Sequence, residues 1–273
     1  MPGTLVIIGG GEDRTGDRAV LRRIVDLAGG PSARVVVLGT ATTVPDELEV
    51  MYRKAFDGLG AGEVTFLPVG SRDEANDPAT VDAIDTATAV FFTGGDQSRI
   101  AAIFGGSDAD TALHEAWQRG IVVAGTSAGA AMMSTTMILG GGEQVPSTSV
   151  RTGPGLGFVS GIVVDMHFAE RGRIARLLAV VAMFPHELGL GIDEDTAVVV
   201  HDTRFEVIGN GAVTVVDAGR ASSVRIPAEG NGPIALTGAQ IHVLPSGYAF
   251  ELLTRTPVIV DAPSDSRARE RGE

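Results

Sequence analysis

Ser127 lies at the centre of a Gly-x-Ser-x-Gly sequence, from Gly125 to Gly129, that directly follows the apolar stretch 122–124. In an α/β protein this pattern is typical of a sharp strand-to-helix turn that exposes the serine hydroxyl as a nucleophile. The two glycines carry no Cβ, so the strand and the helix can approach each other closely. The N–H group of Ala128 then starts the helix, where it can help to hold an oxyanion. A glycine-rich turn with a small polar residue is the alternative.

A serine hydroxyl needs a base within hydrogen-bond reach and an acid that orients the base. The run 161–168 has the pattern of a buried strand whose polar residues, Asp165 and His167, come only at its end. Because they are two positions apart, we expect both on the same face of the strand. We therefore predict that His167 is the base, with a structural histidine at a strand end as the alternative. The other histidines are His114, His186, His201 and His242.

Three arginines follow this strand closely, at Arg171, Arg173 and Arg176. In a helix, Arg173 and Arg176 are neighbours on one face. Cations near the start of a helix are unfavourable for the helix dipole, so their presence favours a bound carboxylate, which the planar arginine fork suits. A solvated face, or pairing with Asp165 and Glu170, is the alternative.

Two further stretches carry groups that could act beside Ser127. The run 93–97 follows an apolar strand, and its glycine N–H groups could complete an oxyanion hole while Gln97 binds a substrate amide or carboxylate. The run 191–197 places Asp193, Glu194 and Asp195 together at a strand end. Like charges repel, so we expect one of them to face an imidazolium or a cation. The alternative for 93–97 is a plain turn, and the alternative for 191–197 is a solvated acidic turn.

The composition narrows the classes of function. The formal net charge of the 273 residues is −13, whereas nucleic-acid binders normally show a basic face. The chain has no cysteine, which excludes disulfides, thiolate nucleophiles and cysteine metal sites. We find neither a signal-peptide pattern nor an apolar run near the ~20 residues of a membrane span. We expect a cytoplasmic protein without nucleic-acid or membrane partners, without a metal site and without a cofactor.

The pattern of elements predicts an α/β fold. Apolar runs at 5–8, 34–38, 64–67, 89–93 and 121–124 alternate with helical patterns. Such alternation favours βαβ units and a mostly parallel sheet with helices on both faces. From about residue 196 the runs become short and are separated by turn signals, which indicates antiparallel additions. We expect one domain over residues 1–262 and a mobile tail at 263–273.

Four motifs occur together and in order. They are Gly-Gly-Asp-Gln at 94–97, Gly-Thr-Ser-Ala-Gly-Ala at 125–130, Asp-x-His-Phe at 165–168 with the spaced arginines, and Gly-Ile-Asp-Glu-Asp-Thr-Ala at 191–197. With these motifs the sequence resembles the cyanophycinases, of the serine peptidase family that also holds α-aspartyl dipeptidases. The resemblance covers most of the chain. It implies a flavodoxin-like sheet, related to the class I glutamine amidotransferase-like fold, and a possible homodimer.

The resemblance also implies an activity and a role for each site residue. Cyanophycinases are serine exopeptidases that release β-Asp-Arg dipeptides from multi-L-arginyl-poly-L-aspartate. In this sequence Ser127 matches the nucleophile, His167 the base and Glu194 the acid partner. The remaining matches are Gly95 and Ala128 for the oxyanion hole, and Gln97, Asp165, Arg171, Arg173 and Arg176 for substrate binding. The sequence departs from the family at Met166, where cyanophycinases usually have glutamine, so the substrate pocket is expected to differ.

Three other functions remain open at this point. The first is a peptidase of the same family for other aspartyl peptides, with Met166 marking the altered specificity. An α/β-hydrolase esterase would use a late histidine as its base, either His201 or His242. A non-catalytic binding protein of the same fold is the third. A glutamine amidotransferase is disfavoured because that chemistry needs cysteine.

Overall fold

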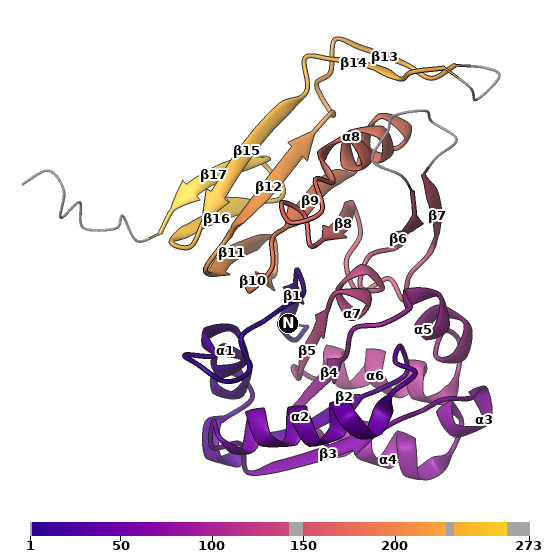
Figure 1. The fold of residues 1–273 in the computed structure, drawn as a ribbon, viewed down its shortest axis with the longest axis vertical. Coiled ribbons are helices and arrows are strands. Elements are labelled where there is room, and N and C mark those ends of the chain that lie inside the picture. The colour runs from indigo at the N-terminus through magenta and orange to yellow at the C-terminus, as the bar shows by residue number, and fades with distance from the viewer. Residues whose placement is uncertain (1, 142–149, 228–231, 261–273) are drawn as a thin grey trace, which may run out of the picture.

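The computed structural model describes residues 2–141, 150–227 and 232–260. Its largest sheet contains five parallel strands in the order β1-β5-β4-β2-β3 (Figure 1). Four antiparallel strands, in the order β10, β11, β16 and β17, continue the same sheet from the other edge of β1. The bounds are β1 Leu5–Ile8, β2 Arg34–Leu38, β3 Glu63–Leu67, β4 Ala89–Phe92, β5 Val122–Thr126, β10 Thr196–His201, β11 Arg204–Gly209, β16 Tyr248–Glu251 and β17 Thr256–Ile259.

Helices cover both faces of the parallel strands, because successive residues of a buried strand point to opposite sides. Val6 and Ile8 pack into a core with α1 and α2, whereas Leu5 and Ile7 belong to a core that includes α4, α5, α6 and α7. The helices are α1 Ala19–Leu27, α2 Pro45–Asp57, α3 Arg72–Ala75, α4 Pro78–Thr86, α5 Gln97–Ile103, α6 Asp108–Gln118, α7 Ala128–Ala131 and α8 Ile174–Met183, with a 3₁₀ turn at Gly30–Ser32. No helix in these described ranges is long and apolar enough to cross a membrane.

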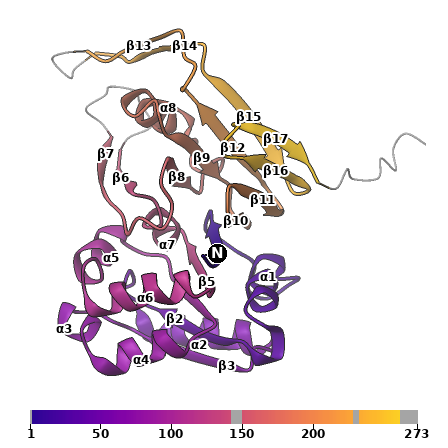
Figure 2. The ribbon, with the colours of Figure 1, turned by 180° about the vertical axis from the view of Figure 1, so that it is seen from behind.

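A second sheet lies above the five parallel strands and beside the antiparallel strands that extend the first sheet, as the two opposite views show (Figures 1 and 2). Its order is β15-β12-β9-β8, and only β8 and β9 pair in parallel among these strands. α8 packs against β9 and β12. The bounds are β8 Ile162–Met166, β9 Leu188–Ile192, β12 Ala212–Asp217 and β15 Gln240–Pro245; two-stranded ribbons are formed by β6 Thr136–Gly140 with β7 Arg151–Pro154, and by β13 Ser223–Arg225 with β14 Ala235–Thr237.

The predicted fold class is confirmed: the central sheet is mainly parallel, and the C-terminal strands that extend it are antiparallel. The second sheet was not predicted, and neither was the position of β8 within it. Its apolar residues, such as Val164 and Leu190, join the same core as Leu5 and Ile7, so the two sheets share one apolar interior. The predicted tail at 263–273 lies outside the described residues.

The antiparallel extension should contribute to the stability of the whole chain. Phe205 on β11 is fully buried, and its ring stacks on Phe250 of β16 at a centroid distance of 5.6 Å. We expect Phe205→Ala to lower the free energy of unfolding by about 3–5 kcal/mol, because it leaves a cavity in the core. Urea denaturation measures this change. Val243→Ala, at an exposed position of β15, is the control; a Phe205→Ala loss as small as the control's would contradict the prediction.

Candidate active site

Ser127 lies in the turn between β5 and α7, with φ 52° and ψ −108°. Positive φ is uncommon for a residue with a side chain, and such strain persists only where the surroundings impose it. A Cβ on Gly125 would stand 2.2 Å from the carbonyl oxygen of Gly129, and one on Gly129 would stand 2.4 Å from that of Phe92. The prediction that these two glycines permit a close strand–helix turn is therefore confirmed.

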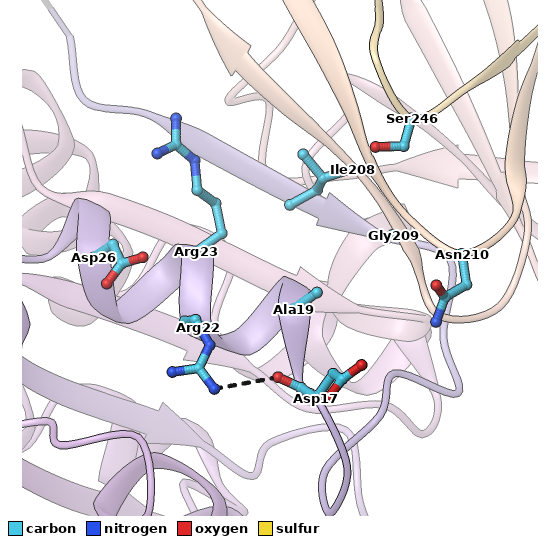
Figure 3. A pocket seen from close by; sticks show the side chains of 9 residues that line it. All are labelled: Asp17, Ala19, Arg22, Arg23, Asp26, Ile208, Gly209, Asn210 and Ser246. Carbon is cyan, nitrogen blue, oxygen red and sulfur yellow. Dashed lines mark hydrogen bonds between the residues drawn. The ribbon is translucent and has the colours of Figure 1, made fainter. Parts of the chain in front are cut away.

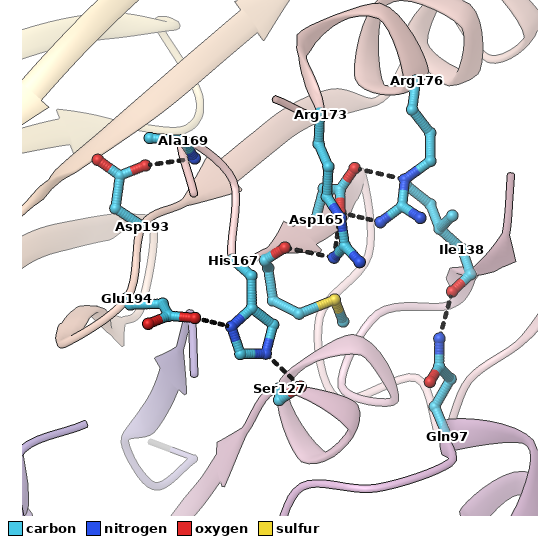
Figure 4. A network of polar contacts seen from close by, with 11 residues as sticks. Gln97, Ser127, Ile138, Asp165, His167, Ala169, Arg173, Arg176, Asp193 and Glu194 are labelled. Carbon is cyan, nitrogen blue, oxygen red and sulfur yellow. Dashed lines mark hydrogen bonds and ion pairs between the residues drawn. The ribbon is translucent and has the colours of Figure 1, made fainter. Parts of the chain in front are cut away.

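His167 contacts the Ser127 hydroxyl. The distance between Ser127 Oγ and His167 Nε2 is 2.9 Å, which is a hydrogen bond (Figure 4). The prediction that His167 shares a strand face with Asp165 was wrong, because β8 ends at Met166 and His167 takes a left-handed backbone conformation with φ 50°. Its own N–H donates to the carbonyl oxygen of Gly9 at 2.7 Å, which fixes this turn against the end of β1.

The other ring nitrogen of His167 contacts Glu194, which lies between β9 and β10. The distance from His167 Nδ1 to Glu194 Oε1 is 2.6 Å, so serine, imidazole and carboxylate form one continuous chain of hydrogen bonds. Among the five histidines, the two late candidates are placed differently. His201 pairs with Asp202, at 3.7 Å, and His242 belongs to β15 in the second sheet. The geometry therefore does not support the esterase arrangement.

The three consecutive acids have different structural roles. Both carboxylate oxygens of Asp193 accept main-chain N–H groups, from Ala169 at 3.1 Å and from Ala212 at 3.0 Å. Asp195 accepts the N–H of Asp13 at 2.8 Å and the side-chain amide of Asn210 at 2.6 Å. These bonds tie together the loops around the site. They leave Glu194 as the acid of this run that faces the imidazole.

The glycines after β1 belong to the site, although no role in the site was predicted for them from the sequence. A Cβ on Gly10 would stand 2.3 Å from His167 Cε1 and 2.6 Å from Nε2. A Cβ on Gly11 would stand 2.7 Å from Glu194 Oε2. The bare backbone of this turn therefore forms the wall against which the imidazole and the carboxylate lie. The available signal was the glycine run directly after the first strand.

The predicted arginine cluster is present, but two of its members are bound to a carboxylate of the protein itself. Asp165 is fully buried and forms a bidentate pair with Arg176, whose Nε lies 2.8 Å from Oδ2. Arg173 Nη1 lies 3.3 Å from the same carboxylate and also donates to the carbonyl oxygen of Met166. Burial, with a contribution from nearby Arg176, lowers the pKa of Arg173. Arg171 is exposed, ahead of α8.

The run 93–97 passes beside the serine. A Cβ on Gly94 would be 3.4 Å from the Cβ of Ser127, so this backbone lies within van der Waals distance of the turn. Gln97 uses its amide N–H to bind the carbonyl oxygen of Ile138 on β6, at 2.7 Å. Within the part of the chain that the structure describes, its amide oxygen accepts no hydrogen bond. Asp96 caps α5 through the N–H of Ser98.

A pocket of about 310 Å³ opens beside Ser127 and His167. Glu12 lines it as a buried residue whose two carboxylate oxygens accept hydrogen bonds from Tyr52, at 2.8 Å, and from Thr126, at 2.5 Å. Burial, reinforced by the charge of Glu12, raises the pKa of Tyr52 well above its usual value, so this phenol remains a donor. The sequence interpretation did not find this buried network.

A second pocket, of about 510 Å³, lies between α1 and the turn after β11 (Figure 3). Its polar groups include Arg22, which donates to the carbonyl oxygen of Asp17, together with Asn210 and Ser246. Neither Ser127 nor His167 lines it. This pocket is larger than the one beside Ser127, but it is not the reactive site because it contains neither the nucleophile nor the base.

The contact between Gly10 and the imidazole gives a test of the site. We expect Gly10→Ala to slow the labelling of Ser127 by a serine-directed phosphonate by at least about 100-fold, because the added Cβ displaces the base. Labelling is followed by mass spectrometry. Gly120→Ala is the matched control: Gly120 has a similar φ of 108°, but a Cβ there meets nothing within 4 Å. Equal labelling rates in the two variants would contradict the role assigned to Gly10.

Comparisons with known proteins identify the family of this chain. The model of peptidase family S51 matches residues 5–208. The chain is 35% identical over 257 residues to a cyanophycinase from Nostoc sp. (strain PCC 7120), covering 92% of this chain and 86% of that protein. It is 36% identical to a cyanophycinase from Geminocystis herdmanii (strain PCC 6308), covering 93% and 96% of the two chains.

A solved structure shares the fold. The crystal structure of a peptidase from an acI-B1 Actinobacterium superposes with a TM-score of 0.71 at 22% identity, covering 92% of this chain and 97% of that one. The family match and the identity to these relatives together classify the protein. The chain belongs to peptidase family S51 and is a serine peptidase similar to cyanophycinases.

Proposed function

We propose that the protein is a serine exopeptidase that hydrolyses multi-L-arginyl-poly-L-aspartate to β-Asp-Arg dipeptides. The observation that carries the proposal is the hydrogen-bonded chain from Ser127 through His167 to Glu194, in a sequence about 35% identical to proteins named cyanophycinase. The cytoplasmic location and the homodimer remain predictions.

In the proposed reaction, Ser127 Oγ attacks the carbonyl carbon of the scissile peptide bond while His167 Nε2 accepts the hydroxyl proton. Glu194 accepts the hydrogen bond from Nδ1–H, which sets the tautomer of the ring and stabilises the imidazolium. The imidazolium then gives its proton to the leaving amine, and an acyl-enzyme remains on Ser127. Water, activated by the neutral imidazole, hydrolyses that ester and frees the serine.

Two main-chain N–H groups are proposed to hold the oxyanion. Ala128 is the first residue of α7, and the first N–H groups of a helix have no partner within the helix. Gly95 follows Gly94, whose backbone lies beside Ser127. An oxyanion between these groups would receive two fixed dipoles, and each such donor is worth about 2.7–4 kcal/mol of transition-state stabilisation.

The arginine cluster is proposed to bind a substrate carboxylate. Asp165 balances only one of the two arginines that it contacts, so the buried group keeps a net positive charge. Exposed Arg171 adds a second cation nearby in sequence. Asp165 itself lies beneath the guanidinium groups, fully buried, and we propose that it orients them. Gln97 supplies an amide oxygen to the substrate on another side of the site.

The acidity of the protein supports a substrate rich in arginine. The net charge of −13 attracts a polycationic side-chain array over long range. Carboxylates of the same substrate then require local cations, which the arginine cluster provides. An enzyme that is acidic overall and basic at its binding residues fits a polymer with both groups in each unit.

A peptidase for other aspartyl peptides is the second candidate, because of Met166. Its side chain is buried in the core, and its carbonyl oxygen is occupied by Arg173. A thioether is only a weak acceptor and donates nothing, unlike the amide usual in cyanophycinases. Rates on a panel of α- and β-aspartyl dipeptides, compared with the polymer, distinguish these two substrates.

Digestion of the purified polymer tests the proposed function. We expect mass spectrometry to detect β-Asp-Arg with the wild-type enzyme, and we expect Ser127→Ala to reduce turnover by at least about 1,000-fold because it removes the nucleophile. Circular dichroism confirms that the variant is folded. The substrate assignment fails if folded wild-type enzyme, active toward the phosphonate, releases no dipeptide.

The arginines should separate into binding and structural roles. We expect Arg171→Gln to raise KM about 10-fold with little change in stability, because an exposed cation loses a charge-assisted bond only to substrate. We expect Arg176→Gln to lower the free energy of unfolding by about 3 kcal/mol, since Asp165 loses its bidentate partner in the interior. Steady-state kinetics and urea denaturation of both variants check the difference. The opposite assignment of the two effects would refute it.

A further inference from the structure

We propose that Arg14 is a specificity-determining residue that binds a second carboxylate of the substrate, within the pocket beside Ser127 and His167. The proposal rests on the function proposed above, because it assigns the next peptide unit of the same substrate. Arg14, Glu12, Leu48 and Tyr52 line that pocket together with the serine and the histidine. The arginines that follow β8 do not line it, so the pocket is a separate binding region next to the same nucleophile.

The guanidinium of Arg14 is held in place, but its N–H groups have only long or weak hydrogen-bond partners among the described residues. Its carbon lies 5.7 Å from the centroid of the Tyr52 ring, and its Nε is 3.6 Å from Glu12 Oε1. Among the described residues, its other contacts are with the carbonyl oxygen of Glu12, at 3.4 Å, and with the sulfur of Met51. A thioether is a weak acceptor. A carboxylate entering the pocket would give this fork a much stronger partner.

Glu12 does not offer an anionic site to the substrate. Only 1% of its side chain is exposed, and both of its oxygens already accept hydrogen bonds from Tyr52 and Thr126. Arg14 is the accessible member of this ion pair, because 29% of its side chain is exposed, so its guanidinium is the group that a ligand in the pocket can reach. Through Thr126, which precedes Ser127, the same carboxylate links Arg14 to the nucleophile turn.

The loop that carries Arg14 is fixed by its neighbour Asp13. The carboxylate of Asp13 accepts three main-chain N–H groups, from Thr15, Gly16 and Arg18, and these bonds lower its pKa to about 2. The N–H of Asp13 donates to Asp195, the residue after Glu194. The position of Arg14 is thus set by the same turns that place the serine and its acid partner, which reduces the entropy lost when substrate binds.

The proposed polymer supplies a suitable carboxylate on each unit. Arginine is joined to the aspartate side chain through its α-amino group, so its own α-carboxylate is free. If the arginines that follow β8 hold the unit on one side of the scissile bond, Arg14 holds the α-carboxylate of the unit on the other side. The aromatic and aliphatic walls, Tyr52 and Leu48, then cover the methylene groups of that unit.

Kinetics on matched two-unit substrates test this assignment. The substrates are (β-Asp-Arg)₂ and its two derivatives in which one arginine α-carboxylate is converted to an amide. We expect Arg14→Gln to reduce kcat/KM on the first substrate by about 10- to 100-fold, as expected for the loss of a charge-assisted bond. One amide derivative should lower the wild-type rate by a similar factor and should be insensitive to Arg14→Gln. An equal loss on all three substrates, or no loss, overturns the proposal.

A second measurement does not depend on the polymer. We would compare Ser127 labelling by two phosphonates that differ only in a free carboxylate or its methyl ester on the arm next to phosphorus. Wild-type enzyme should react faster with the carboxylate, and Arg14→Gln should remove that preference, so that the two phosphonates label Ser127 at equal rates. If the preference is absent, or survives in Arg14→Gln, the proposal is wrong, even where the polymer is not cleaved and the proposed function has failed.

Two further variants complete the test. Arg14→Lys keeps the charge but loses the fork, so an intermediate preference is expected. Arg22→Gln, at an exposed arginine of α1 outside this pocket, is the control for loss of one surface charge from the acidic protein. Thermal denaturation of each variant shows whether the loop has been disturbed. A control with the same loss of preference as Arg14→Gln would attribute the effect to the overall field and overturn the proposal.

Discussion

The site depends on one hydrogen bond between the two sheets, from the N–H of His167 to the carbonyl oxygen of Gly9. Ser127 follows β5 of the first sheet, His167 follows β8 of the second, and Glu194 lies on the connection from β9 to β10. The three side chains are therefore assembled across an interface between sheets. The glycine turn after β1 is the backbone surface on which they meet, and it accepts the base at close range because it has no Cβ.

Three arginines around this site form ion pairs with carboxylates of the protein itself. Asp165 holds two arginines in the interior, and Glu12 holds a third beside a tyrosine ring. A buried pair of this kind is weak evidence for stability, because desolvation offsets most of the attraction. Its benefit is orientation: guanidinium groups that are already fixed lose less entropy when they bind a carboxylate. In the proposed function, both groups offer such fixed guanidinium donors to substrate carboxylates.

Much of the parallel half of the fold could be predicted from the sequence, because each strand is short, apolar and bounded by glycine. The strand at Leu5–Ile8 and the elbow around Ser127 are examples in which local pattern and tertiary role agree. β9 was not predicted as a strand, since two of its five residues are glycine and only Ile192 is β-branched. Its glycines are required by packing: a Cβ on Gly189 would collide with Val181 of α8. That demand comes from the helix that precedes the strand, so it leaves no signal within the strand itself.

The site residues that could be predicted from the sequence are those that carry a local signal. His167 was predicted as a site residue although its predicted place on a strand was wrong. A polar residue after an apolar run marks the end of a strand, whether that residue is the last of the strand or the first of the following turn. From the sequence, Asp165 could bind either the substrate or arginines of the protein. Only the three-dimensional arrangement shows that Arg173 and Arg176 donate hydrogen bonds to its carboxylate. Glu12 and Arg14 follow a glycine run and carry no spacing that connects them to Tyr52, which lies on α2.

The central position of β1 has a consequence for biosynthesis. This strand is synthesised well before its two neighbours in the sheet, which begin at residues 122 and 196. Its apolar side chains can therefore be buried only after strands that are far away in the sequence have been synthesised. Contacts between residues so far apart in the sequence slow folding. The glycine turn receives the imidazole and the carboxylate only after β10 has been made. Until then the nascent chain cannot form the hydrogen-bonded chain of Ser127, His167 and Glu194.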